Sequence, residues 1–244
     1  MVERKEHLSP IVAGFDVFRA REYDCRSCHR EITHCYQKKV DEGQSPQTGL
    51  EWAVFGCADS RTPVELVFGF RPGQAFVHRT MGNMIASTPQ QDAGTWAAIS
   101  YAVGLGIKKF LIAGHGGQDH AGCGAMKAAA YGSKDEMVNL WLKQKASFTR
   151  RLAGLPDAGG RHNHAARLNI ALGLRRLDRY FDKLAVQTGS AWARPHAAGT
   201  FFNKDEGNLY LVNRQTMALE PLTCHPLRPD RGSTPSTCPP LVAA

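Results

Sequence analysis

Two thiols and one imidazole occupy places in the sequence from which they could bind a metal ion together. Cys57 and His115 each follow a short apolar run and a glycine, in Phe55-Gly56-Cys57 and Ala113-Gly114-His115. Cys123 precedes a predicted helix, and the dipole at a helix start lowers the pKa of a thiol. Two thiolates and one imidazole make a zinc set whose fourth tetrahedral position stays open, as in catalytic zinc sites. Taken one by one, both cysteines also fit a simpler role as small apolar side chains of the core.

The proposed ligands meet only if the strands before them are neighbours in one sheet. The apolar run at 52–56 is typical of a short buried strand, 75–78 and 109–113 predict two further strands, and 94–105 predicts a helix before the third. Strands that alternate with helices imply an α/β protein with a mainly parallel central β-sheet flanked by helices. Cys57 and His115 then emerge at the carboxyl edge of that sheet, where open α/β sheets place their functional sites.

The chain divides into three predicted parts. In residues 1–50 apolar side chains recur at helical spacing among many charges, which predicts a helical N-terminal arm too thin to be a domain. Residues 51–220 are predicted to form the zinc-binding α/β catalytic domain. Residues 221–244 are rich in proline and are predicted to be an irregular tail.

The second half of the predicted domain contains long helices and a hairpin. Helical spacing predicts helices at 135–152 and at 164–187. Between them, a loop at 155–164 carries His162 and His164, which are expected in solvent and could relay protons. Two apolar runs flank a polar turn and predict a terminal hairpin of 200–202 and 209–212.

Composition excludes several classes of protein. The 30 Lys+Arg against 22 Asp+Glu give a formal net charge of +8, but the basic residues are dispersed, so we expect no nucleic-acid partner. No apolar run is long enough to span a bilayer, and residues 1–10 do not read as a signal peptide. We therefore expect no membrane association and a cytoplasmic location, with inclusion in a protein-shelled compartment left open. Seven cysteines, an odd number, argue against a disulfide framework.

An ordered set of short motifs runs through the middle of the chain. The motifs are Cys57-Ala58-Asp59-Ser60-Arg61, Pro72-Gly73-Gln74-Ala75-Phe76-Val77-His78-Arg79, Gly82-Asn83, Tyr101-Ala102-Val103, Gly114-His115 and Cys123-Gly124. In type, order and near-regular separation they resemble the β-class carbonic anhydrases. The resemblance extends from Val12 to about Val212 and so covers most of the chain.

The resemblance implies an activity, a cofactor and roles for particular residues. It implies that Cys57, His115 and Cys123 hold Zn²⁺, and that Asp59 and Arg61 form the paired dyad of the family. In carbonic anhydrases zinc is known to lower the pKa of its bound water from roughly 16 to about 7, which supplies a hydroxide for reversible hydration of CO2 to bicarbonate and a proton. Pairing with Arg61 can hold Asp59 off the metal as an acceptor, whereas an unpaired Asp59 could become a fourth ligand. By the same resemblance the protein is expected to be a homodimer or an assembly of dimers.

The chain departs from the family pattern in ways that leave alternatives open. Five residues are inserted between the metal-binding His and Cys, and His120 stands at the spacing from Cys123 that the family uses. We favour His115 because a strand end positions it, whereas His120 lies in a Gly-rich insert. Thr62, Gln74 and Thr80 replace residues usual in the family, which puts the lining of the pocket in question.

Two other functions and a second metal site remain open from the sequence. The same zinc centre could hydrolyse carbon disulfide or carbonyl sulfide, which like CO2 are linear and apolar. A noncatalytic scaffold or bicarbonate sensor is the alternative from another class, and zinc content would distinguish it. Cys25, Cys28 and Cys35 could bind a second zinc, although they also fall on one helical face as an apolar stripe.

Overall fold

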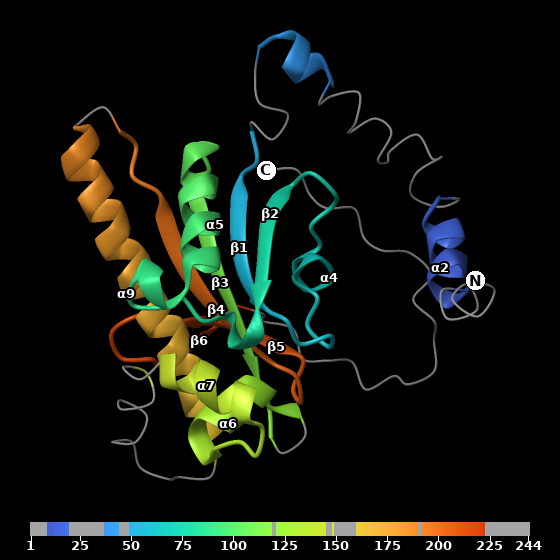
Figure 1. Cartoon of the computed structure of the whole chain (residues 1–244), viewed down its shortest axis with the longest axis vertical. Helices are drawn as coiled ribbons and strands as arrows, with labels where there is room; N and C mark the ends of the chain where they lie inside the picture. The colour runs from blue at the N-terminus through green and yellow to red at the C-terminus, as the bar shows by residue number, and fades with distance from the viewer. Residues whose placement is uncertain are drawn as a thin grey trace.

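A six-stranded sheet forms the centre of the computed structural model, which describes residues 9–19, 37–43, 49–118, 121–144, 148, 160–189 and 192–222 (Figure 1). The strands lie in the order β2-β1-β3-β4-β5-β6. Their bounds are β1 Trp52–Cys57, β2 Ala75–Thr80, β3 Lys109–Gly116, β4 His196–Asn203, β5 Asn208–Val212 and β6 Leu219–Pro221. β2, β1, β3 and β4 pair in parallel, while β4, β5 and β6 pair antiparallel. This arrangement confirms the predicted α/β class with a mainly parallel sheet.

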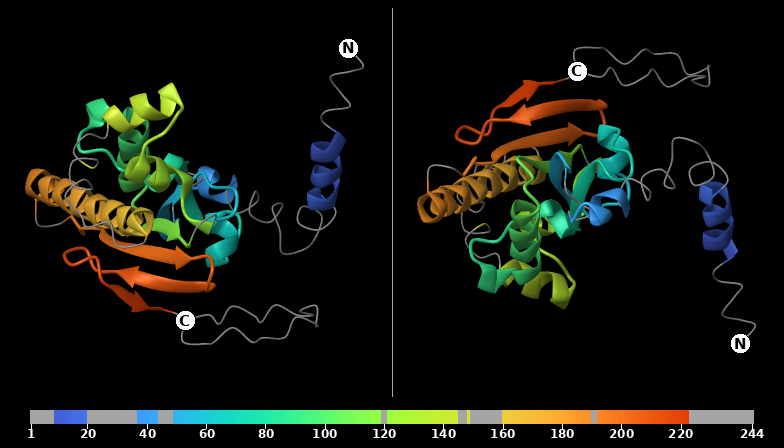
Figure 2. Two further views of the ribbon diagram at one scale, coloured as in Figure 1. Left: turned by 90° about the horizontal axis from the view of Figure 1, so that it is seen from below. Right: turned by 90° about the horizontal axis from the view of Figure 1, so that it is seen from above.

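Helices connect and flank the strands. The α-helices are α2 Ser9–Phe18, α4 Val64–Phe68, α5 Ala93–Gly104, α6 Gly124–Tyr131, α7 Glu136–Gln144 and α9 Arg161–Thr188, and the 3-10 helices are η2 Met81–Asn83 and η3 Pro89–Gln91. α2 stands away from the sheet and its helices in every view (Figure 2). Among the described helices, none combines the length and the hydrophobicity that a membrane span requires.

The two faces of the sheet are covered unequally. On one face, Phe55 and Ile112 of the strands pack in the same buried cluster as Ile99 of α5 and Leu174 of α9. On the other face, Val54 and its neighbours on β3 pack against Val64 of the short helix α4. Successive residues of a strand point to opposite faces, and residues buried on both faces give the continuous apolar runs that the sequence shows. The larger core lies between the sheet and α9.

The structure corrects three details of the sequence prediction. β3 continues to Gly116, so His115 lies inside a strand rather than after it. α9 begins at Arg161, so the prediction of His162 and His164 in a solvated loop is wrong; His162 is buried and bonded to the backbone of Gly117. A third antiparallel strand, β6, was not predicted. Cys25, Cys28, Cys35, His120 and the tail from 223 onward lie outside the described residues.

Candidate metal centre

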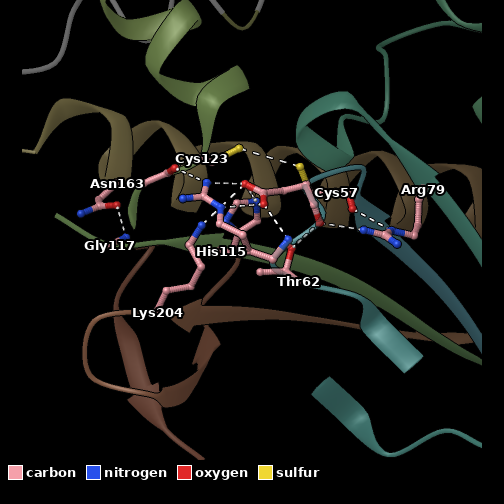
Figure 3. A network of polar contacts seen from close by, with 11 residues as sticks. Cys57, Thr62, Arg79, His115, Gly117, Cys123, Asn163 and Lys204 are labelled. Atoms are coloured by element: carbon pink, nitrogen blue, oxygen red, sulfur yellow. Dashed lines mark hydrogen bonds and ion pairs between the residues drawn. The ribbon is translucent and has the colours of Figure 1, made fainter. Parts of the chain in front are cut away.

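Cys57, His115 and Cys123 lie together at the carboxyl edge of the parallel strands (Figure 3). One possible ligand atom from each residue lies within 4.8 Å of the others, and the two sulfur atoms are 3.9 Å apart. The three residues are between 2% and 4% exposed. They are the single cluster of this kind among the residues that the structure describes.

Strand pairing and a helix start bring the three side chains to one point. β1 and β3 are neighbours, with Gly56 opposite Ala113, so both strands end at the same edge. Cys123 is the residue that caps the start of α6. Gly114 allows α9 to approach β3 closely, because a Cβ added there would lie 2.6 Å from a carbon of Ile170. A substitution at this glycine would therefore displace the strand that carries His115.

The donor set fits a zinc ion in both chemistry and spacing. Two sulfurs at about 2.3 Å from a tetrahedral zinc lie about 3.8 Å from each other, close to the distance between the sulfurs of Cys57 and Cys123. Both ring nitrogens of His115 are buried and have no hydrogen-bond partner among the described residues. Buried polar atoms are normally paired, so an imidazole left in this state beside two thiols is suited to a metal.

The two thiols differ in how readily they ionise. The hydrogen bond with Cys123 lowers the pKa of Cys57 to about 4, and His115 acts in the same direction. The same hydrogen bond, together with burial, raises the pKa of Cys123 above its ordinary value. One thiolate is therefore present at neutral pH, and the second forms when a cation replaces the proton that the two sulfurs share.

Asp59 and Arg61 form the ion pair expected from the motif. Arg61 donates to the Asp59 carboxylate from its backbone N–H at 3.0 Å, from Nε at 2.9 Å and from Nη2 at 2.6 Å. These hydrogen bonds hold the pKa of Asp59 well below its usual range. Asp59 Oδ2 also lies 3.7 Å from Nε2 of His115, so the carboxylate stands directly beside the cluster.

Two further cations near the centre were not given a role from the sequence. Arg79 donates to the carbonyl oxygens of Cys57 at 2.9 Å and Asp59 at 2.7 Å, and so fixes the backbone between ligand and dyad. The Nζ atom of Lys204 lies 3.6 Å from Asp59 Oδ2. Burial lowers the pKa of Lys204. No local pattern marks Lys204, because it follows a strand by one residue and its neighbours come from distant parts of the chain.

The segment after His115 is anchored from two sides. At the start of α9, Asn163 Oδ1 accepts from the backbone N–H of Gly117 at 3.0 Å, and His162 Nε2 donates to the Gly117 carbonyl at 2.9 Å. From the β4–β5 turn, the backbone N–H of Lys204 donates to Gly116 O and the Asp205 carboxylate accepts from Gln118 N. The described part of the insertion thus has a defined backbone path beside the centre.

Comparison with known proteins agrees with this geometry. The sequence profile described as carbonic anhydrase matches residues 52–209. A carbonic anhydrase of Emericella nidulans is 30% identical over 180 residues, which are 72% of this chain and 73% of the relative. The solved β-carbonic anhydrase CcaA superposes with a TM-score of 0.67 at 24% identity and covers 88% of this chain and 99% of its own. A solved chain of one of two tetrameric β-carbonic anhydrases of Sordaria macrospora gives a TM-score of 0.58 at 23% identity and covers 87% of this chain and 98% of its own.

Fold and site together define an α/β enzyme with a buried Cys-His-Cys centre suited to a metal. The profile match over residues 52–209 and the Emericella relative show that the chain belongs to the carbonic anhydrase family. The superposition on CcaA gives it the fold of the β class, which confirms the resemblance identified from the motifs.

Proposed function

We propose that the protein hydrates CO2 reversibly to bicarbonate and a proton, with zinc held by Cys57, His115 and Cys123. The observation that carries this proposal is the buried Cys-His-Cys cluster with the Asp59–Arg61 ion pair beside it. Zinc held by this set would acidify a water molecule and so supply a nucleophile toward CO2 at neutral pH. The three side chains use only one ligand atom each, which leaves room for a substrate in a four-coordinate site.

In this proposal Arg61 keeps Asp59 available as an acceptor. The carboxylate stays ionised because Arg61 donates three hydrogen bonds to it. The same bonds oppose its movement onto the metal as a fourth ligand, since that movement would leave the guanidinium partly unpaired. Arg61 Nη2 also donates to Gly122 O at 3.1 Å, which ties the dyad to the residue before Cys123. Asp59 therefore sits where it can accept a proton or a hydrogen bond from the reacting water.

The proposal is tested by measuring CO2 hydration and bound zinc on the same preparation. We expect stopped-flow proton release from CO2 that is lost when a chelator removes zinc and returns when zinc is added back. Carbonyl sulfide and carbon disulfide are assayed in parallel by sulfide release. Sulfide release without CO2 hydration would replace this proposal with the hydrolase alternative, and zinc-loaded protein inactive on all three substrates would point to a noncatalytic member.

We also propose that the protein assembles as a homodimer or a set of dimers. The solved Sordaria neighbours are tetrameric, and α2 exposes the apolar side chains of Val12 and Phe15, which lie on one face of the helix and are 54% and 58% accessible. An apolar helix face held away from its own sheet is suited to packing on a partner subunit. Sedimentation of the full chain and of Val12→Asp/Phe15→Asp tests this proposal, and a monomeric wild-type chain would contradict it.

A further inference from the structure

Lys204 reaches the metal centre from the turn between β4 and β5. β4 pairs with β3 so that Phe202 lies opposite His115. Phe202 therefore shares a face of the sheet with His115, and Lys204 follows β4 by one residue, where its backbone N–H donates to Gly116 O of β3. Figure 3 shows the Lys204 side chain extending from the β4–β5 turn toward His115. The lysine therefore enters the site through strand register, independently of the segment that carries Cys57 and Asp59.

The ammonium of Lys204 is buried and has unused donors. Its side chain is only 9% exposed, and no acceptor among the described residues lies within hydrogen-bond distance of Nζ. Asp59, at 3.6 Å, already receives its hydrogen bonds from Arg61. The neighbouring Asp205 carboxylate accepts from the backbone of Gln118 instead. A buried ammonium has three donors, and leaving them unused is costly, so this arrangement points to a ligand.

The charges around Lys204 favour an anion. Asp59 and Arg61 cancel each other, and two thiolates cancel the charge of a zinc ion held by them. Lys204 and Arg79 then give the surroundings of the centre an excess of positive charge, and of the two Lys204 lies beside the Asp59 carboxylate. CO2 is neutral, whereas bicarbonate carries one negative charge, so the excess charge distinguishes the two sides of the proposed reaction.

We propose that Lys204 forms an anion subsite of this centre, in which its ammonium donates to a small monovalent oxyanion, bicarbonate under the proposed function. This inference rests on the proposed function only for the identity of the anion. The subsite itself rests on the burial, the unused donors and the direction of the lysine side chain. Lys204 acts here as a substrate-binding residue and leaves zinc to the three ligands.

The experiment measures binding of nitrate, which is planar and singly charged like bicarbonate but does not react. Nitrate is titrated by calorimetry into the zinc-loaded wild type and into Lys204→Met, which keeps chain length and removes charge. We expect nitrate affinity to fall about 10- to 100-fold, the range for losing one hydrogen bond to a charged group. KM for bicarbonate should rise by a similar factor, while KM for CO2 changes by no more than roughly threefold. Zinc content should stay that of the wild type.

Two further variants separate charge near the site from charge elsewhere and from folding. Lys183→Met removes the same charge about 30 Å along α9 from Asn163 and should leave nitrate affinity unchanged. Lys204→Arg should retain most of the affinity. If Lys204→Met lost zinc or failed to fold, Lys204→Gln against Lys204→Arg would make the same comparison.

The outcomes for the subsite and for the proposed activity are distinguishable. Nitrate affinity equal to the wild type in Lys204→Met, or in Lys204→Gln if the first variant fails, would overturn the subsite. A wild type that hydrates no CO2 but binds nitrate in a Lys204-dependent way would overturn the proposed function and keep the subsite. If Lys183→Met lost as much nitrate affinity as Lys204→Met, the loss would be a general charge effect, and the anion subsite would again be overturned.

Discussion

The metal centre and the cavity between α5 and α9 differ in whether their buried polar groups have hydrogen-bond partners. The cavity has a volume of about 580 Å³ and is lined by Trp96 and by basic side chains that include Arg179 and Lys183. Its buried guanidinium, Arg176, is engaged by Ile85 O and Ser87 Oγ. The centre is a small cluster of donor atoms, and there the His115 nitrogens and Lys204 Nζ have no hydrogen-bond partner among the described residues.

The volume of a cavity alone therefore does not mark a metal site; a cluster of ligand atoms whose buried nitrogens lack partners does. The described residues that line the cavity include no Cys, His, Asp or Glu, so they offer no ligand set for a metal. Its polar groups stabilise the fold through hydrogen bonds already made. In the centre, buried donors and acceptors have no hydrogen-bond partner among the described residues, so they are available to bind a metal ion or another ligand.

Removing a thiol of the metal centre should have the largest effect on zinc content and activity. We expect Cys57→Ala and Cys123→Ala to lose bound zinc and CO2 hydration together, because a metal bound by two remaining ligands is held weakly. Elemental analysis of the purified variants measures this. Near-normal zinc in either variant would mean that the metal site lies elsewhere in the chain, and a wild-type content near two zinc ions would point to Cys25, Cys28 and Cys35.

Substitution of the zinc-binding histidine should lower zinc content as much as loss of a thiol, which tests whether His115 or His120 is the ligand. His115→Ala should lose zinc, whereas His120→Ala should retain it, because β3 already directs His115 toward both thiols. Zinc is measured in both variants after the same purification. Loss of metal only in His120→Ala would reverse the assignment.

Asp59→Asn should separate metal binding from activity. The amide has no charge to pair with Arg61 and accepts a proton poorly, so we expect hydration to fall by about 10²- to 10⁴-fold, the usual contribution of a positioned acid or base. Zinc content should remain at the wild-type level because the ligands are intact. Wild-type turnover with zinc in place would remove Asp59 from the proposed mechanism.

Zinc binding should release about one proton at neutral pH. The pKa of Cys57 is lowered to about 4, so its thiol is ionised at pH 7, whereas the pKa of Cys123 is raised and its proton is retained. Binding through two thiolates displaces that proton, so zinc affinity should rise about tenfold for each unit of pH increase around neutrality. Calorimetry of metal-free protein in buffers with different heats of protonation counts the proton. Release of none would show that both thiols ionise before the metal arrives.

Asn163→Ala should have a smaller effect, on the backbone beside the centre. The variant removes the acceptor for Gly117 N–H, and we expect the free energy of unfolding to fall by about 1 kcal/mol. Zinc should remain bound, since no ligand is altered. Denaturant unfolding of the zinc-loaded protein measures the change; an unchanged midpoint would show that His162 and Asp205 suffice to hold the segment.

The smallest effect is expected from a substitution in the cavity between α5 and α9. Arg179→Ala removes an exposed charge that lines it and touches neither ligand nor dyad, so zinc content and CO2 hydration should stay at wild-type values. Loss of activity with zinc retained would contradict the comparison, because it would link the cavity to the reaction.

Much of the sheet could be predicted from the sequence, for a local reason. β1 and β3 are short strands buried in the parallel sheet, so their residues read as apolar runs without help from the rest of the chain, and the half-buried edge strand β2 is marked by Ala75-Phe76-Val77. The start of α9 and strand β6 could not be predicted in this way. His162 lies within a helix because it contacts Gly117 and Tyr131, and β6 forms because β5 offers it an open edge.

Cys57, His115 and Cys123 could be identified as a possible zinc set from the sequence, because the residue types at strand and helix ends are local features. The local Asp59–Arg61 pair could be identified in the same way, since two residues so close in the chain can meet without tertiary contacts. That Lys204 reaches the same carboxylate and that Asn163 holds the segment after His115 could be seen in the folded chain alone. These contacts depend on the register of β4 against β3 and on the packing of α9. Neither quantity is encoded in any short stretch of residues, because both follow from how distant apolar surfaces fit together.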